Sequence, residues 1–310
     1  MFKDELVTVV IPTYNHAHFL ERALQSVLAQ TYSHWEALVI DNHSQDNTDE
    51  VVRAFGDPRI RLLKINNNGV IAASRNLGIR SARGKWIAFL DSDDYWYDKK
   101  LEVVMALAKL DNDYDVLCHD ELMADLKSGF RRVLRHGPYK EDFYKNLLIE
   151  GNRLSPSATA VKSSFLREHG LYFSEIKEYI TVEDYDFWLN LAKNKAKFSF
   201  VNQILGVYTI HDTNNSAQID RHLNNTEALL KNHIFNIQKF ELNSNKLWQR
   251  IFTSIQLMYI RRYLVQKEYK IAFKLFIKST ASHPLLMALI LCKKLINRYC
   301  AGVVNFMSLK

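Results

Sequence analysis

The chain has 310 residues, of which 47% are hydrophobic and 24% charged, and this balance is that of a globular protein with a sizeable core. Three cysteines without CxxC spacing argue against a disulfide framework and a cysteine metal cluster, and fit a reducing compartment. The first twelve residues contain two acidic residues before a short apolar run that ends at Pro12, which is unlike a signal peptide. The late apolar run 285–292 is far shorter than the roughly 20 residues that span a bilayer. We therefore expect a cytoplasmic location and no membrane span.

The net charge of +7 is unevenly distributed along the chain. Residues 246–310 carry eight lysines and four arginines against one acid, Glu268, which gives them a net charge of +11 and leaves −4 for the first 245 residues. A domain held against an anionic surface would have such a basic tail. No known nucleic-acid-binding module accompanies the tail, so we expect no nucleic-acid partner.

Strand-like and helix-like segments alternate over the first third of the chain. Apolar or β-branched runs predict strands over residues 6–11, 35–40, 60–65 and 85–90. The segments between them predict helices over residues 18–30, 48–55 and 70–82. Near-continuous apolar strands between helices imply a mostly parallel sheet that is covered on both faces. The predicted fold class is therefore α/β.

Polar loops follow all four predicted strands. They read PTYN (12–15), DNHS (41–44), NNNG (66–69) and DSDD (91–94). Because ligands of open α/β sheets bind beyond the carboxyl ends of the strands, these loops predict one shared binding site.

The sequence contains neither a GxGxxG fingerprint nor a P-loop, so a bound nucleotide would need another phosphate grip. Asp91 and Asp93, two residues apart at a strand end, can both reach one Mg²⁺ or Mn²⁺ ion that bridges to phosphate oxygens. The alternative for this stretch is a solvated turn in which Asp94 favours a following helix start.

Four stretches of the chain resemble the family 2 glycosyltransferases, the large inverting group with the GT-A fold. They are VVIPTYNHAHFLERALQSVLAQTY, ALVIDNHSQDNT, SRNLGIRSARGKWIAFLDSDD and VEDYDFWLNLA. The resemblance covers roughly residues 5–215 and has the motifs in the family's order. It implies a Rossmann-like GT-A fold, to which the pattern and charge of the tail add a helical, basic extension. The predicted parts are a nucleotide-sugar-binding half (1–112), an acceptor-binding and catalytic-base half (113–225) and a helical basic region (226–310).

The resemblance implies a nucleotide-binding set drawn from several loops. Its members are Pro12, Thr13, Tyr14, Asn15, Asp41, Ser74, Arg75, Asn76, Asp91 and Ser92. The first four would pack around the nucleobase and ribose, Asp41 would accept a hydrogen bond from uracil, and Arg75 would approach the diphosphate. The loop that commonly reads DDGS in the family reads DNHS here, which leaves the base preference open.

The resemblance also implies a metal site for Mn²⁺ or Mg²⁺. Asp91 and Asp93 match the DxD motif, with the second aspartate toward the metal. His211, on a predicted strand, is a candidate for a metal or phosphate contact, with a structural role as the alternative. Asn215 and Ser216 are weaker candidates.

Asp184 resembles the catalytic base of the family. Glu183 and Asp186 are the neighbours that could take this role instead. The structural alternative is a helix cap, with Thr181 at the N-cap and Asp184 at the third helical position. The two readings of Asp184 are compatible.

The tail is helical by pattern. In residues 269–280, three lysines form one stripe, while Ile271, Leu275 and Phe276 share another side. This pattern has two explanations. The helix could pack on the protein in the ordinary way with its lysines in water, or it could lie at the interface of a membrane of anionic lipid.

These features predict a metal-dependent, inverting transfer of a sugar from a UDP-sugar to a hydroxyl of a glycan acceptor. The basic tail suggests that the acceptor is lipid-linked, at the inner face of the cytoplasmic membrane, as in O-antigen or capsule assembly. The alternatives are a non-catalytic module that binds nucleotide or glycan, and nucleotidyl transfer. The sequence makes no prediction of the oligomeric state.

Overall fold

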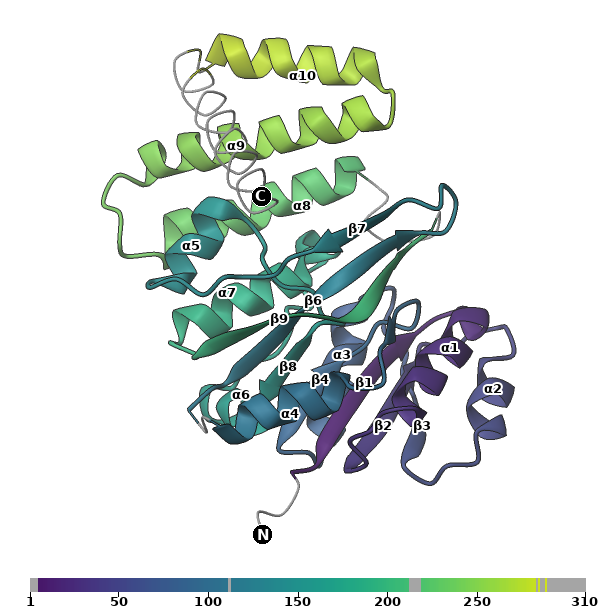
Figure 1. Cartoon of the computed structure of the whole chain (residues 1–310). Coiled ribbons are helices and arrows are strands. Elements are labelled where there is room, and N and C mark those ends of the chain that lie inside the picture. Colours follow the sequence, from purple (N-terminus) through teal and green to yellow (C-terminus); the bar gives the residue numbers. More distant parts are fainter. Residues whose placement is uncertain (1–4, 111–112, 212–218, 283, 285–287, 289–310) are drawn as a thin grey trace, which may run out of the picture. The chain divides into compact units, whose positions relative to one another are not determined.

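The structure is a computed structural model that describes residues 5–110, 113–211, 219–282, 284 and 288. The chain divides into two compact units, Met1–Gln218 and Ile219–Lys310. The first unit holds all strands of the described residues, and the second is helical (Figure 1).

One sheet forms the centre of the first unit. Its strands stand in the order β3-β2-β1-β4-β8-β6-β9-β5, with β7 beside β6. They are β1 (Val7–Thr13), β2 (Trp35–Asp41), β3 (Ile60–Lys64), β4 (Trp86–Phe89), β5 (Tyr95–Trp96), β6 (Val116–Asp125), β7 (Arg131–Leu134), β8 (Thr159–Lys162) and β9 (Phe198–Ile210). Strands β1 to β4 pair in parallel, and β8 joins them to the parallel pair β6–β9 through antiparallel contacts. The predicted α/β fold is confirmed.

Helices cover both faces of this sheet. They are α1 (Ala17–Leu28), α2 (Thr48–Ala54), α3 (Ile71–Ser81), α4 (Lys100–Leu110), α5 (Phe143–Glu150), α6 (Ser163–His169), η1 (Lys177–Tyr179) and α7 (Glu183–Lys193). Buried side chains of α1 and α4 share one apolar cluster with Val7, Val9 and Ile11 of β1. On the opposite face, α3 lies so close to β1 that a Cβ added to Gly78 would be 2.3 Å from Val10 Cγ1. Only glycine permits this approach.

The strand β5 has no counterpart among the sequence predictions. It directly follows the DSDD turn, and its Tyr95 and Trp96 pair with Val207 and Gly206 of β9. Two residues are too few to show a period, so the sequence offers no local signal for this strand. The pairing brings the end of β9 beside the turn at 91–94.

The second unit consists of helices, as predicted for the tail. They are α8 (Ile219–Asn232), the π-helix η3 (His233–Ile237), α9 (Ser244–Val265) and α10 (Tyr269–Ser282). The side chain of Asn243 caps α9 by accepting a hydrogen bond from the Lys246 backbone N–H at 2.9 Å. Leu247, Ile251 and Tyr259 are buried along α9. Among the described helices, none is both long and apolar enough to cross a lipid bilayer.

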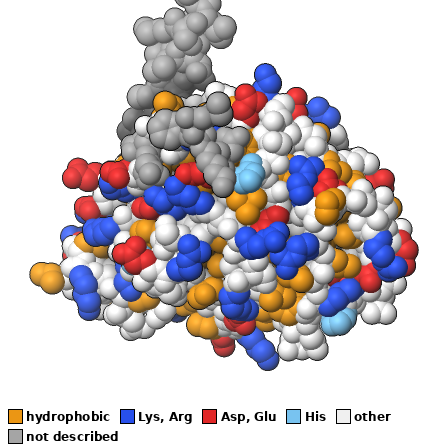
Figure 2. Space-filling view, turned by 90° about the horizontal axis from the view of Figure 1, so that it is seen from below, with side chains coloured by type: hydrophobic (Ala, Val, Ile, Leu, Met, Phe, Trp, Pro, Cys, Tyr) orange, Lys and Arg blue, Asp and Glu red, His pale blue; other side chains and the backbone are white. Residues whose placement is uncertain are grey.

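The surface in Figure 2 is mixed in character. Basic and acidic side chains are interspersed on this face, with hydrophobic side chains in small groups between them. This distribution is normal for the surface of a globular protein.

Candidate active site

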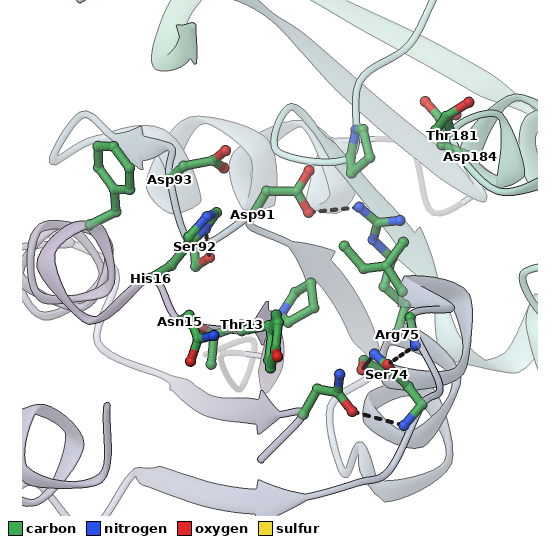
Figure 3. Close-up of a pocket in the computed structure, with 18 of the residues that line it drawn as sticks. Thr13, Asn15, His16, Ser74, Arg75, Asp91, Ser92, Asp93, Thr181 and Asp184 are labelled. Atoms are coloured by element: carbon green, nitrogen blue, oxygen red, sulfur yellow. Dashed lines mark hydrogen bonds and ion pairs between the residues drawn. The ribbon is translucent and has the colours of Figure 1, made fainter. Parts of the chain in front are cut away.

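A cavity of about 680 Å³ lies beyond the carboxyl ends of β1 and β4, where the sequence predicts the binding site (Figure 3). The predicted site residues that line it are Pro12, Thr13, Tyr14, Asn15, Ser74, Arg75, Asp91, Ser92, Asp93, Asp184 and His211. The cavity therefore brings together residues from the first loop, α3, the DSDD turn, the start of α7 and the end of β9.

Two predicted nucleotide-binding residues are not part of the cavity wall. Asp41 is fully buried and accepts hydrogen bonds from the Ser44 backbone N–H and from Lys64 Nζ, the latter at 2.5 Å. The Asn76 side chain donates to the Phe173 carbonyl and accepts from its N–H, both at 2.9 Å. Both side chains organise the loops around the cavity, and Asn42 lines the wall beside Asp41.

The three aspartates of the DSDD turn have separate partners. Asp91 Oδ1 accepts a hydrogen bond from Arg75 Nη2 at 2.7 Å, and Asp93 Oδ2 lies 2.9 Å from His211 Nε2. Asp94 turns into the protein and is 1% exposed. The stretch that follows is β5, and α4 begins only at Lys100. The alternative of a solvated turn with Asp94 at a helix start is therefore wrong.

Arg75 joins the two acidic parts of the cavity. Its guanidinium is 3% exposed and donates to Asp91 and, at 2.8 Å, to Glu183 Oε1. Burial alone would lower the pKa of Arg75, but the charges of Asp91 and Glu183 raise it above its ordinary value. Burial also raises the pKa of Asp91, against the opposing charge of Arg75. Arg75 Nε and Glu183 Oε2 are buried without a hydrogen-bond partner, which leaves polar atoms unsatisfied at this cavity.

The backbone before α7 is strained. Thr181 has φ +82°, which a β-branched residue rarely adopts, and it lines the cavity. The N-cap of α7 is Val182, without a side-chain hydrogen bond, and the helix begins at Glu183. The predicted cap, with Thr181 at the N-cap and Asp184 at the third position, is wrong, because the chain turns one residue later and Asp184 is second in the helix.

Asp184 is the acid of α7 that is best placed for proton transfer. Its Oδ2 accepts a hydrogen bond from Asn152 Nδ2 at 3.1 Å, and its Oδ1 accepts from the Tyr185 backbone N–H at 2.7 Å. Burial, and then the charge of Glu183, raises the pKa of Asp184 to about 7. The other two acids are engaged elsewhere, because Glu183 pairs with Arg75 and Asp186 accepts from Asn190 Nδ2 at 3.0 Å.

His211 is held among aromatic rings. It stacks on Phe19 with ring centroids 4.6 Å apart, and the His16 ring lies 5.7 Å away. Burial lowers the pKa of His16, against the opposing charge of Asp93. His16, His18 and Phe19 line the cavity but are absent from the sequence-based set, although they directly follow PTYN.

The donor atoms of the cavity suit a hard divalent cation. Asp93 and His211 supply one carboxylate oxygen and one imidazole nitrogen within reach of each other. The described residues contain no group of three or more His, Cys, Asp or Glu side chains arranged for a metal ion. The pair could supply two of the ligands of such a cation. Asn215 and Ser216 lie outside the described residues.

Comparison with known proteins gives the family. The profile of glycosyl transferase family 2 matches residues 8–169. The Escherichia coli enzyme WfgD, a UDP-Glc:alpha-D-GlcNAc-diphosphoundecaprenol beta-1,3-glucosyltransferase, is 30% identical over 197 residues, which cover 62% of this chain and 71% of WfgD. The putative teichuronic acid biosynthesis glycosyltransferase TuaG of Bacillus subtilis is 38% identical over 99 residues, which cover 31% of this chain and 39% of TuaG.

Solved structures agree on the fold. Residues 1–349 of S. aureus TarS in complex with UDP superimpose with a TM-score of 0.58 at 21% identity, covering 80% of this chain and 70% of the other. The Pyrobaculum calidifontis mannosyltransferase PcManGT in complex with GDP-Man and Mn²⁺ gives a TM-score of 0.60 at 16% identity, covering 95% and 80%. The chain therefore belongs to glycosyl transferase family 2 and is a glycosyltransferase with the GT-A fold.

Proposed function

We propose that the chain transfers a sugar from a UDP-sugar to a hydroxyl of a lipid-linked glycan during the synthesis of a cell-surface polysaccharide. The observation that carries this proposal is that one cavity holds both Asp184, with a pKa of about 7, and the pair Asp93–His211. The names of WfgD, which uses UDP-Glc and a diphosphoundecaprenol-linked acceptor, and of TuaG support the substrate class.

The donor nucleotide would bind along the first loop. Tyr14 is 53% exposed at the cavity and offers a ring on which a nucleobase can stack. Asn42, Asn67 and Gly69 line the same part, and the Asn42 Oδ1 accepts from the Asn67 backbone N–H at 2.9 Å. This bond leaves the Asn42 Nδ2 donor for a base carbonyl.

The diphosphate would lie next to Asp93 and His211. These two side chains would hold Mn²⁺ or Mg²⁺, and the ion, when bound, would offset the negative charge that develops on the leaving diphosphate. Arg75 would fix the direction of Asp91 toward the ribose, because its guanidinium already holds that carboxylate at 2.7 Å. The protein groups would thus orient the donor before transfer.

Asp184 would act as general base. Its carboxylate would take the proton of the acceptor hydroxyl while that oxygen forms a bond to the anomeric carbon. The bond between this carbon and the diphosphate oxygen would break on the opposite face, and UDP would leave with the bonding electrons. The anomeric configuration would therefore invert. A carboxyl with a pKa near the working pH suits this role.

The chain would also bind an anionic membrane surface through α10, and such binding would bring it close to a lipid-linked acceptor. On α10, Tyr269 is 61% and Phe273 is 67% exposed. Lys270, Lys274 and Lys278 are also exposed and, because they are four residues apart, share one side of the helix. Exposed aromatic rings beside a lysine stripe are typical of helices that lie in a membrane interface.

A donor and acceptor screen tests the proposed activity. We would incubate the full chain with UDP-sugars and GDP-mannose, Mn²⁺ and synthetic polyprenyl-diphosphate-linked mono- and disaccharides. Acceptor-dependent release of UDP, with a product of inverted anomeric configuration by NMR, is expected. Consumption of GDP-mannose alone would overturn the UDP assignment, and nucleotide binding without any product would favour the non-catalytic alternative.

A further inference from the structure

Thr209, near the end of β9, is held from two sides by residues that belong to other parts of the sequence. Its side chain is 1% exposed, and it lies two residues before His211. One set of bonds comes from Asp94 in the DSDD turn, and the other comes from Arg22 on α1. Both sets also reach the backbone of the same turn.

The first set of bonds passes through Asp94. Its Oδ1 accepts a hydrogen bond from the Thr209 backbone N–H at 2.7 Å, and its Oδ2 accepts from Ser157 Oγ at 2.5 Å. Ser157 Oγ in turn accepts from the Asp91 backbone N–H at 3.1 Å. Asp94 and Ser157 are each 1% exposed, so these bonds are shielded from water. They connect the start of the turn to β9.

The second set of bonds passes through Arg22. Its Nη2 donates to the Asp93 backbone carbonyl at 2.7 Å and to Thr209 Oγ1 at 3.0 Å. The guanidinium lies 4.5 Å from the centroid of the Tyr95 ring, which keeps it in place above β5. Arg22 therefore connects the backbone of Asp93 to the side chain of Thr209.

We propose that Arg22 and Asp94 are positioning residues that fix the distance between Asp93 and His211 by holding Thr209. The inference rests on the proposed function, in which Asp93 and His211 hold the cation. The turn carries Asp93, and His211 directly follows β9. Strand β6 holds β9 in the sheet as far as Ile210, whereas the β5–β9 ladder, beside the turn, reaches only to Val207. Beyond Val207, two hydrogen bonds at Thr209, one from its backbone N–H and one to its hydroxyl oxygen, link the strand end to the turn and restrict the movement of His211 relative to Asp93. Metal sites depend strongly on such outer hydrogen bonds.

The variant Thr209→Val tests this inference. Valine keeps the volume of threonine and the N–H bond to Asp94, but removes the acceptor for Arg22. Binding of Mn²⁺ in the presence of UDP would be measured by electron paramagnetic resonance, which requires no turnover. We expect Thr209→Val to weaken Mn²⁺ binding about tenfold and Thr209→Ser, which retains the hydroxyl, to bind as the wild type does. UDP binding without metal should be unchanged in both variants.

Thr8→Val is the matched control. The Thr8 hydroxyl is fully buried and donates to Glu36 Oε1 at 2.8 Å, in the amino-terminal part of β1 and away from the cavity. The same hydroxyl accepts from the Gly84 backbone N–H at 2.9 Å, so this variant loses two buried hydrogen bonds, and its melting temperature should fall at least as far as that of Thr209→Val, with unchanged Mn²⁺ affinity. Arg22→Met provides a second test, because it keeps the side-chain length on a half-buried helix face and removes the donors.

Three results would contradict the inference. Thr209→Val and Arg22→Met could bind Mn²⁺ as tightly as the wild type, which would leave Arg22 a purely structural role. Thr8→Val could weaken Mn²⁺ binding as much as Thr209→Val, which would make the effect one of general stability. A wild-type chain that binds UDP but no Mn²⁺ would remove the cation site itself, and this failure of the proposed function is recognisable because it needs no variant.

Discussion

His211 Nε2 lies 2.9 Å from Asp93 Oδ2, although 118 residues separate the two in the sequence. The pair joins the turn after β4 to the end of β9, and both side chains line the cavity. A carboxylate and an imidazole at this distance can bond to each other or share a divalent cation between them. Removal of the cation and removal of the Asp93 carboxylate should therefore both impair metal-dependent sugar transfer.

We expect EDTA to abolish turnover and added Mn²⁺ to restore it. Asp93→Ala should lower the affinity for Mn²⁺ at least about tenfold, because it removes a ligand from a pair. Activity against Mn²⁺ concentration is the measurement. Asp113→Asn is the control, since Asp113 is exposed and pairs with Lys197. Full activity in EDTA would contradict the metal requirement.

Asp184→Asn should reduce kcat by about 100- to 10,000-fold, because the amide cannot accept the hydroxyl proton. The KM for the donor should change little. In the wild type, kcat should rise with pH through about 7, where half of the Asp184 carboxyl groups are ionised, and level off above that pH. Glu178→Gln, at an exposed position in η1, should behave as the wild type. If Asp184→Asn retained wild-type kcat, another group would have to be the base.

The raised pKa of Asp184 also predicts a cost in stability. The unfolded chain ionises this carboxyl near pH 4 and the folded chain only near pH 7, so stability is lost as the pH rises between these values. Asp184→Asn should therefore unfold at a higher urea concentration than the wild type at pH 8 and at an equal concentration at pH 4. The gain is at most about 4 kcal/mol, since one pKa unit is worth about 1.4 kcal/mol. A less stable variant at pH 8 would refute this assignment of the pKa.

Arg75→Ala should destabilise the fold by about 3–5 kcal/mol, because it leaves the buried carboxylate of Glu183 and the half-buried carboxylate of Asp91 without their cation. Urea unfolding measures this change. Arg53→Ala is the matched control, because Arg53 also contacts two acids, Asp49 and Glu50, but its side chain is 70% exposed. Its effect should stay below about 1 kcal/mol. Equal effects of the two variants would show that burial does not strengthen the Arg75 bridge.

Vesicle flotation tests the proposed binding of α10 to anionic lipid. The full chain should float with vesicles that contain phosphatidylglycerol and remain behind with pure phosphatidylcholine, and salt should weaken binding. Replacement of Lys270, Lys274 and Lys278 by glutamine should reduce binding on the order of 100-fold, at about 1 kcal/mol per lysine. Leu242→Ser, at a fully exposed position of the same unit, should have no effect. Unchanged flotation of the triple variant would exclude this surface.

The sequence predicts most of the parallel half of the sheet, because apolar runs and their polar ends are local features. PTYN and DSDD lie at the cavity because both follow such runs. The burial of Asp94 is not predictable in this way, since it depends on Ser157 and Thr209, which are distant in the chain. The hydrogen bond between Asn152 and Asp184 is not predictable either, because the two residues lie 32 positions apart in the sequence. Long-range hydrogen bonds leave no period in the sequence.

Gly78 has a consequence for the width of the cavity. Arg75 lies one turn earlier on α3. The distance between this helix and β1 therefore also sets how far the Arg75 guanidinium reaches into the cavity toward Asp91. A methyl group at position 78 would collide with Val10 and push α3 away from β1, although neither Gly78 nor Val10 lines the cavity. The absence of a side chain at position 78 thus sets where the Arg75–Asp91 ion pair lies in the cavity wall.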